Sequence, residues 1–247
     1  MIHSATLVHD DVLDSSDMRR GRPSVTSTYG SRQATLTGSY ILTSSSQLLA
    51  QIDNPDVISV LSRVLDDLLR GETLQLIQLD DEDRRFKVYF EKTYGKTASL
   101  IANGCKAVAM LSNPQDTSLV ESAYQFGRNL GMAFQLIDDV LDLSCKGDAL
   151  GKPSGGADLS LGIVTAPVLF ASQQFDEVAA AISRNFSRPN DVPLVLDYIA
   201  KSDGLEQTRM LAEFHFQEAQ RQILRIQDSP YRQALLHVAA KFIQRDR

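Results

Sequence analysis

What this chain lacks excludes several classes of protein. Its 247 residues contain no tryptophan and only two cysteines, Cys105 and Cys145, which are too far apart to form a CxxC pair. The sequence therefore indicates neither a disulfide framework nor a zinc site. No apolar run reaches the length needed to span a bilayer. The formal net charge is −6, so a nucleic-acid-binding surface is not indicated either.

Alternating strand patterns are also lacking, and helical periodicity dominates the chain. Residues 21–30 and 147–162 carry turn-forming residues and are predicted loops. Hydrophobic residues make up 43% of the sequence, enough for a sizeable core. We therefore expect one all-α domain over residues 1–247. The predicted helices are Ala34–Gln51, Pro55 to about Leu79, about Arg85 to Leu111, Asp116–Ser144, Ile163–Phe175, Glu177–Phe186, Val192–Ser202, Leu205–Ile226 and Pro230–Gln244.

Two acidic segments share one pattern, because residues 10–14 and residues 138–142 both read DDVLD. On an α-helix, residues four apart lie about 40° from each other around the axis. Asp10 and Asp14 therefore share one helix face, as do Asp138 and Asp142. Like charges at this spacing destabilise an isolated helix, so two such segments suggest bound cations. Mg²⁺ fits best, because it commonly bridges one or two carboxylates to a substrate phosphate.

Two other acidic pairs serve as internal controls. Asp66-Asp67 and Asp80-Asp81 are followed, four residues after the first Asp, by Arg70 and Arg84 instead of a third Asp. We interpret these as solvated acidic faces with ordinary intrahelical ion pairs.

Cationic and amide side chains accompany the two DDxxD segments. Arg19 and Arg20 follow the first segment, and their guanidinium groups suit diphosphate oxygens. Plain salt bridges with the nearby carboxylates are the alternative. Lys96-Thr97 lies in the middle of a predicted helix, where a lysine is most often a solvated charge. Gln135 precedes Asp138 and Asp139 by about one helical turn, and Lys152 follows the second segment. Together these residues indicate a site for a polyanion bridged by metal ions.

The ordered set of motifs resembles the trans-isoprenyl diphosphate synthases. The motifs are DDxxDxxxxRRG, then KT, then QLxDDxxD, then GKP with a later Asp-Leu and Thr-x-Pro. The surrounding residues are most similar to the long-chain polyprenyl diphosphate synthases that make the ubiquinone side chain. This resemblance implies a bundle of long antiparallel helices around a central cavity. It also implies prenyl transfer from an allylic diphosphate to isopentenyl diphosphate, giving a long all-trans polyprenyl diphosphate.

The resemblance assigns roles residue by residue. Asp10, Asp11 and Asp14 form the first Mg²⁺ cluster, and Asp138, Asp139 and Asp142 form the second. Binding of the allylic diphosphate falls to Arg19, Lys96 and Lys152, and binding of isopentenyl diphosphate to Arg20. Thr97 and Gln135 support the allylic diphosphate and the developing cation, and with Lys96 they are the predicted catalytic residues. No protein nucleophile is needed, and His9 is interpreted as a helix or supporting residue.

Product length is expected to depend on residues that precede the first acidic segment. Ala5 and Thr6 lie five and four residues before Asp10, where short-chain members of the family carry bulky aromatics. Two small side chains would let a growing chain pass. The alternative is that Ala5 is small because helices pack closely there.

The sequence departs from the family pattern in two places. The family pattern begins upstream of Met1, and its first helices carry part of the isopentenyl diphosphate site, the cavity wall and the dimer interface. We therefore expect that upstream residues are missing. Ser39 follows Gly38 where family members usually have Asp.

Three hypotheses follow. The first is a polyprenyl diphosphate synthase, working as a homodimer or with a different subunit, in mitochondria by resemblance only. The second is a truncated or noncatalytic subunit that regulates a partner synthase; such subunits usually lose one acidic cluster, whereas both are complete here. The third is a terpene cyclase, which the low aromatic content of 7% disfavours.

Overall fold

The computed structural model describes residues 1–75, 77, 81–144 and 156–243. The chain divides into two compact units, Met1–Ser59 and Val60–Arg247, and the division falls inside helix α4 (Pro55–Gln75). Each unit is described by itself. The prediction of one domain over 1–247 stays a prediction.

The first unit is built on two helices that pack along each other, α1 (Ile2–Leu13) and α3 (Ser31–Ala50). Between them lie a two-stranded antiparallel hairpin and one short helix. These elements are β1 (Met18–Arg19), β2 (Arg22–Pro23) and α2 (Val25–Tyr29). The predicted loop over 21–30 is therefore wrong for part of its length. Ser24 begins α2, since its hydroxyl accepts a hydrogen bond from the Ser27 N–H at 3.0 Å.

The second unit contains the long helices of the chain. Its predicted helices are confirmed, with ends that shift by a few residues. The elements are the rest of α4, α5 (Glu82–Thr93), the π-helical turn η1 (Tyr94–Ala98), α6 (Ser99–Ser112), α7 (Thr117–Ser144), α8 (Ala157–Ser160), α9 (Ala166–Ser172), α10 (Asp176–Ser183), α11 (Asp191–Lys201), α12 (Gly204–Ile223) and α13 (Pro230–Ile243). Helix α8 lies in the predicted loop 147–162, so that prediction is wrong for the described residues 157–160.

Side-chain caps fix where several long helices begin. Asn54, Asp81, Asp116 and Ser229 each accept a hydrogen bond from the backbone N–H three residues later. Such caps satisfy N–H groups that have no partner within the helix. Two of these helices begin at the predicted residues, Pro55 and Pro230, whereas α5 begins at Glu82, three residues before the predicted start.

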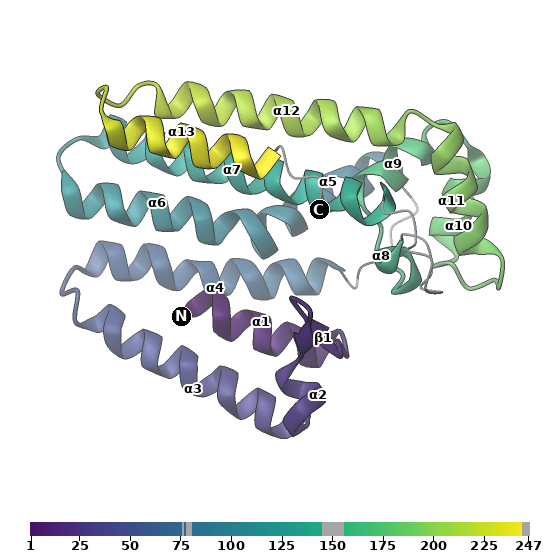
Figure 1. The fold of residues 1–247 in the computed structure, drawn as a ribbon, viewed down its shortest axis with the longest axis horizontal. Helices are drawn as coiled ribbons and strands as arrows, with labels where there is room; N and C mark the ends of the chain where they lie inside the picture. Colours follow the sequence, from purple (N-terminus) through teal and green to yellow (C-terminus); the bar gives the residue numbers. More distant parts are fainter. Residues whose placement is uncertain (76, 78–80, 145–155, 244–247) are drawn as a thin grey trace. The chain divides into compact units, whose positions relative to one another are not determined.

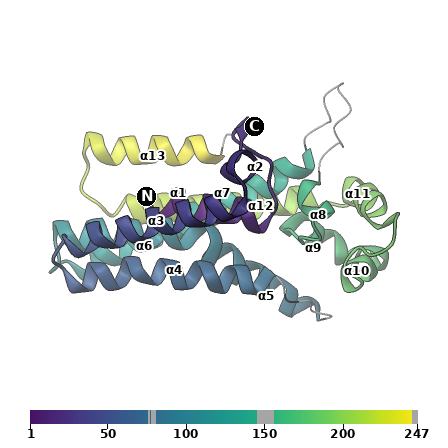
Figure 2. The same cartoon turned by 90° about the horizontal axis from the view of Figure 1, so that it is seen from below.

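Long helices pack side by side in the second unit. Helix α7 packs against α6 and α12, and α13 packs against α7 and α12 (Figure 1). The short helices α8–α11 gather at one end of these long helices (Figure 2). Among the described residues of this unit, buried side chains form apolar clusters, and α7 contributes Phe126, Leu130 and Ala133 to one and Leu136 and Ile137 to another. Helix α7 is therefore central in its unit.

Helices α5, η1 and α6 form one continuous helical run that contains a π-helical turn. The turn carries Gly95, Lys96 and Thr97. Two pairs of small residues, Gly127 and Gly131 on α7 and Ala98 and Ala102 opposite, allow a close backbone approach, since a Cβ added at Gly131 would lie 2.5 Å from the Ala98 Cα. π-Turns inside α-helices are frequent at functional sites.

No helix among the described residues is both long and apolar enough to cross a membrane. The prediction of an all-α fold is confirmed, since the strands found in the described ranges are the two-residue pair β1 and β2.

A partly buried polar contact joins α7 to α12. His215 Nδ1 lies 2.8 Å from the Asn129 side-chain oxygen, so the ring donates this hydrogen bond. Burial, followed by the charge of Arg128, lowers the pKa of His215 from 6.5 to about 4. The folded chain therefore holds a neutral imidazole at pH values where the unfolded chain would bind a proton.

We expect this histidine to make the fold sensitive to acid. Its contribution is fully present above pH 6.5 and is lost as the pH falls from 6.5 toward 4, because only the unfolded state is protonated in that window. The loss should amount to about 1–3 kcal/mol. Urea unfolding at pH 7 and pH 4.5 measures it. His215→Gln should reduce the difference, whereas His237→Gln, at an exposed position on α13, should keep it; equal behaviour of the two variants would contradict the assignment.

Candidate functional site

The first acidic segment lies at the C-terminal end of α1. Asp10 and Asp11 belong to the last turns of the helix, and Asp14 ends it, with its N–H donating to the Asp10 carbonyl at 2.8 Å. Asp10 and Asp14 are half-buried, while Asp11 is 3% exposed. The first acidic segment therefore lies on a helix, as the four-residue spacing predicted.

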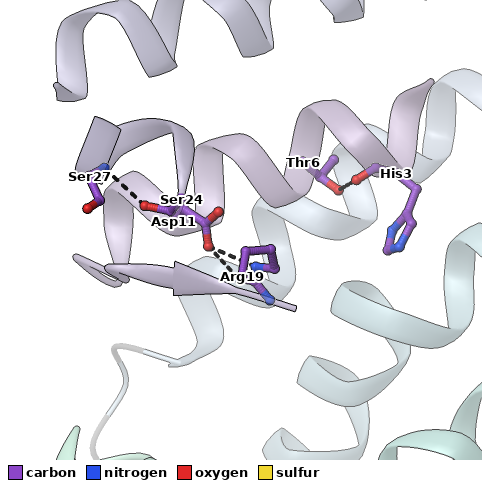
Figure 3. A network of polar contacts seen from close by, with 6 residues as sticks. All are labelled: His3, Thr6, Asp11, Arg19, Ser24 and Ser27. Atoms are coloured by element: carbon purple, nitrogen blue, oxygen red, sulfur yellow. Dashed lines mark hydrogen bonds and ion pairs between the residues drawn. The ribbon is translucent and has the colours of Figure 1, made fainter. Parts of the chain in front are cut away.

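Arg19 pairs with Asp11 (Figure 3). Its Nε and one terminal nitrogen donate to the same carboxylate oxygen at 2.9 and 2.5 Å. The β1–β2 hairpin brings the two together, because Arg20 and Gly21 form its turn with φ of +52° and +74°. For Arg19, the sequence left a plain salt bridge open as the alternative to diphosphate binding. The structure contains this salt bridge, and Arg20 is exposed at the turn.

His9 belongs to the contact between α1 and α3. Its Nε2 donates to the Thr35 carbonyl at 3.1 Å, and a Cβ added at Gly38 would lie 2.3 Å from that nitrogen. The interpretation of His9 as a helix or supporting residue therefore agrees with its contacts. Ser39 beside Gly38 is exposed.

The predicted chain-length residues lie on the buried side of α1. Ala5 is fully buried and Thr6 is 9% exposed. The Thr6 hydroxyl donates to the His3 carbonyl at 3.0 Å (Figure 3). Close packing around Ala5 and a role in product length are both compatible with this burial, so the chain-length role stays a prediction.

The second acidic segment lies near the C-terminal end of α7. Asp138 and Asp142 are half-buried and Asp139 is 2% exposed. The two oxygens of Asp142 accept hydrogen bonds from the backbone N–H groups of Ala157 and Asp158 at 3.1 and 3.4 Å. Asp142 therefore caps the N-terminus of α8 from a distant part of the sequence.

A chain of hydrogen bonds connects the π-turn to the second acidic segment. The Thr97 hydroxyl donates to the Gln135 amide oxygen at 2.7 Å, and the Gln135 amide nitrogen donates to Asp139 Oδ1 at 3.0 Å. Asp139 Oδ2 accepts from the Tyr89 hydroxyl at 2.6 Å and from the Ala166 N–H at 3.4 Å. The structure thus brings together Thr97, Gln135 and Asp139, as the sequence predicted for one polar site.

Lys96 points to α4 in this structure. Its ammonium group lies 2.8 Å from a Glu72 oxygen and donates to the Gln75 amide oxygen at 2.9 Å. The lysine is half-buried, so it is not the solvated charge that is commonest for a lysine. Two glycines permit this approach, since a Cβ at Gly95 would lie 2.4 Å from the Asp67 carbonyl oxygen and one at Gly71 2.9 Å from the Lys96 side chain.

The control pairs behave only partly as expected. Arg70 lies 3.4 Å from Glu91 on α5, at an exposed position. Asp67 accepts a hydrogen bond from the Ser99 hydroxyl across to α6. The prediction of intrahelical ion pairs for Asp66-Asp67 is therefore wrong, because neighbouring helices offer closer partners. Asp80 lies outside the described residues.

Carboxylates crowd around the second segment. Burial, then the charges of Asp142 and Asp139, raise the pKa of Asp158 to about 6. Burial also raises the pKa of Asp139, against the opposing effect of its hydrogen bonds from Gln135 and Tyr89. Nearby, burial lowers the pKa of Lys92, whose ammonium group donates to the Val164 carbonyl at 3.3 Å. The charges of Asp142 and Asp139 thus disfavour ionisation of Asp158, and a cation bound nearby would relieve this repulsion.

Among the described residues, the acidic side chains of the two segments occur as pairs and do not form a closed set of metal ligands. No group of three or more His, Cys, Asp or Glu side chains within the described ranges converges in a geometry that would hold a metal ion. Lys152, a predicted ligand of the diphosphate, lies outside the described residues. Pairs of half-buried carboxylates suit Mg²⁺ that takes its remaining ligands from phosphate and water.

Sequence reasoning missed Tyr89, Lys92 and Glu72. Tyr89, Lys92 and Lys96 are spaced three and four residues apart along one helical run, and this periodicity could have grouped them on one face. Glu72 carried no such signal, because its contact to Lys96 depends on how α4 packs against η1.

The fold and these contacts define an all-α protein with two acidic helix ends, each near cationic side chains. The family model for polyprenyl synthetase matches residues 1–199. The chain therefore belongs to the polyprenyl synthetase family, and its all-α fold is of the polyprenyl synthase type.

Curated relatives agree with this assignment. The chain is 50% identical to the all trans-polyprenyl-diphosphate synthase PDSS1 of Homo sapiens, over 100% of this chain and 59% of the relative. It is 42% identical to decaprenyl-diphosphate synthase subunit 1 of Schizosaccharomyces pombe, over 99% of this chain and 66% of the relative. It is also 42% identical to mitochondrial solanesyl-diphosphate synthase 1 of Oryza sativa, over 99% and 58%. The chain thus spans about three fifths of the length of these relatives.

A solved structure is similar in fold over the whole chain. The polyprenyl synthase of Caulobacter crescentus, complexed with calcium and isoprenyl diphosphate, matches with a TM-score of 0.85 and 31% identity. The match covers 100% of this chain and 76% of that one.

Proposed function

We propose that this chain is a Mg²⁺-dependent trans-prenyltransferase that extends an allylic diphosphate with isopentenyl diphosphate. The product would be a long-chain all-trans polyprenyl diphosphate for the ubiquinone side chain. The observation that carries the proposal is that both DDxxD segments are complete and lie at helix ends, within a chain of the polyprenyl synthetase family.

The donor set fits divalent cations. Asp10 and Asp14 on one helix end, and Asp138 and Asp142 on the other, are half-buried oxygen donors of the kind that Mg²⁺ prefers. The resemblance also assigns Asp11 and Asp139 to the metal set, and both, like Asp142, accept hydrogen bonds from protein groups. Bound ions would supply neutralisation of the charge that grows on the leaving diphosphate. A relative complexed with calcium and isoprenyl diphosphate supports this choice of ligands.

Cationic and amide side chains would perform the rest of the chemistry. Arg19, Lys96 and Lys152 are proposed to hold the allylic diphosphate and Arg20 the diphosphate of isopentenyl diphosphate, since preorganised cations stabilise a departing anion. Arg19 and Lys96 would exchange their carboxylate partners, Asp11 and Glu72, for phosphate oxygens. The Gln135 and Thr97 oxygens are proposed to face the allylic cation.

Incorporation of radiolabelled isopentenyl diphosphate tests this function. Geranyl, farnesyl and geranylgeranyl diphosphates serve as primers, each with and without Mg²⁺. Long lipid product that requires Mg²⁺ is expected. Product that forms only after a partner synthase is added would favour the alternative, a noncatalytic or truncated subunit. A released cyclic hydrocarbon would contradict both.

Assembly and location follow from the relatives as proposals. A relative named as a subunit supports a homodimer or a hetero-oligomer with a second synthase subunit. A relative named as mitochondrial supports a mitochondrial location. Size-exclusion chromatography with light scattering distinguishes a monomer from an oligomer of this chain.

Ala5→Phe is expected to shorten the product. Ala5 is fully buried on α1, five residues before Asp10, so a phenyl ring there would block a chain growing past this side of the helix. It would also destabilise the fold by about 1–3 kcal/mol through overpacking. Chromatography of the dephosphorylated products measures chain length. Ala5→Val is the smaller control, and unchanged product length in a folded Ala5→Phe variant would contradict the assignment.

A further inference from the structure

We propose that Asp139 is a positioning residue and not a metal ligand, and that with Tyr89 it sets the direction in which the Gln135 amide faces Thr97. This inference rests on the proposed prenyl transfer, because Thr97 and Gln135 are the groups whose orientation it explains.

Both oxygens of Asp139 are already engaged by protein donors. Oδ1 accepts from the Gln135 amide nitrogen, and Oδ2 accepts from the Tyr89 hydroxyl and the Ala166 N–H. The residue is 2% exposed, while its neighbour Asp138 and the next-turn Asp142 are half-buried. Asp142 also accepts two hydrogen bonds, but it is half-buried and can meet a hydrated ion. At Asp139 three hydrogen bonds and the surrounding packing enclose the carboxylate, so an ion with its other ligands would have to open this packing or displace a donor, and leaving a buried donor unpaired is costly.

The direction of each hydrogen bond follows from its partner. A carboxylate only accepts, so the Gln135 side chain must turn its NH₂ group to Asp139 and its carbonyl oxygen to Thr97. The Thr97 hydroxyl consequently donates its proton to Gln135, and the lone pairs of its oxygen remain available as acceptors. Asp139 thereby orients two predicted catalytic side chains without contacting a substrate.

Tyr89 holds the carboxylate in place. Its ring is 4% exposed, and its hydroxyl bond to Asp139 is the shortest in the chain of contacts, at 2.6 Å. It comes from α5, while Ala166 comes from α9, so two helices besides α7 fix the Asp139 rotamer. Residues held in this way by packing and hydrogen bonds give a site its precision.

Reversing the polarity of the Gln135–Asp139 hydrogen bond provides the sharpest test. In Asp139→Asn, the new amide keeps its oxygen toward Tyr89 and Ala166 and turns its NH₂ group to Gln135. Gln135 must then flip, and Thr97 loses its acceptor. We expect kcat to fall by about 10²-fold with KM values within about threefold, as for a small misplacement of catalytic groups.

The double variant Asp139→Asn with Gln135→Glu should restore activity. The introduced carboxylate accepts from both the asparagine amide and the Thr97 hydroxyl, and the total charge returns to its original value. We expect recovery to within about tenfold of the wild type, since one normal hydrogen bond is worth about that factor. A metal-ligand role would not be rescued, because the anionic oxygen at position 139 stays absent.

Ligand-induced stabilisation gives a readout that does not depend on turnover. Mg²⁺ with inorganic pyrophosphate should raise the Tm of the wild type by about 5 °C at saturating ligand. Asp139→Asn should keep this shift, whereas Asp138→Asn and Asp142→Asn should lose most of it. Loss of the shift in Asp139→Asn, or failure of the double variant to recover in a folded protein, would overturn the inference.

Tyr89→Phe completes the test with a matched control. It removes one hydroxyl and should lower kcat about tenfold while leaving the Mg²⁺ dependence unchanged. Tyr124→Phe removes a hydroxyl that contacts Tyr94 at 2.9 Å, outside the Asp139 contacts, and should keep wild-type kcat. Equal kcat in the two variants would count against Tyr89. A wild-type chain with neither label incorporation nor a Tm shift would contradict the proposed function itself.

Discussion

Replacing Asp138 by asparagine is expected to lower the rate of isoprenyl transfer by about 10²- to 10³-fold. Asp138 is half-buried near the end of α7 and lies one turn before Asp142. Its neighbour Asp139 accepts hydrogen bonds with both carboxylate oxygens. Removal of its charge takes away an anionic oxygen donor from the proposed cation site. The substitution keeps the size and shape of the side chain, so the variant should fold.

Incorporation of labelled isopentenyl diphosphate over a range of Mg²⁺ concentrations measures this effect. The half-saturating Mg²⁺ concentration should rise together with the loss of kcat. Asp66→Asn is the control, because Asp66 is an exposed carboxylate of an acidic pair on α4 that lacks the DDxxD spacing. If Asp66→Asn impaired transfer as strongly as Asp138→Asn, the effect would come from lost negative charge in general. The proposed site would then be wrong.

Gly95→Ala is expected to destabilise the chain by about 3 kcal/mol and to impair transfer as well. An added Cβ would lie 2.4 Å from the backbone carbonyl oxygen of Asp67, and a backbone atom cannot rotate away as a side chain can. The π-turn must therefore move from α4 or change its local geometry. Either change displaces Lys96, whose ammonium group now lies between Glu72 and Gln75.

Gly104→Ala is a matched control on the same helical run. A Cβ there would meet nothing within 4 Å, so alanine should stabilise the helix by about 0.5–1 kcal/mol. Urea unfolding gives the two free energies, and incorporation assays give the two rates. Gly95→Ala that is as stable as Gly104→Ala would contradict the close packing of η1 on α4. A stable Gly95→Ala with normal transfer would separate the π-turn from catalysis.

The acidic segments show what sequence spacing can predict. Asp10 and Asp14, like Asp138 and Asp142, are four residues apart, and helical geometry alone places such pairs on one face. The helix starts at Pro55 and Pro230 were predictable for a similar reason, since proline favours the first turn of a helix, and in the structure a preceding polar side chain also caps each of them. These features depend on neighbours in the sequence, and so they could be predicted without a tertiary structure.

The partners of individual side chains were less predictable. Arg70 was expected to pair within α4 and instead contacts Glu91, and Lys96 was expected to be solvated or free for phosphate and instead contacts Glu72. The short hairpin that returns Arg19 to Asp11 was also missed, because two-residue strands carry no periodicity that a sequence window can detect. In each case the partner comes from a different element.

The sequence by itself determined the all-α fold, the acidic helix ends and the order of motifs that places the chain in the polyprenyl synthetase family. Only the tertiary structure decided that Asp139 is buried and engaged by Tyr89, Gln135 and Ala166, while Asp138 beside it is not fully enclosed. The physical reason is that consecutive helical residues point in directions about 100° apart. Which of two adjacent aspartates meets the protein interior therefore depends on the helices packed around α7.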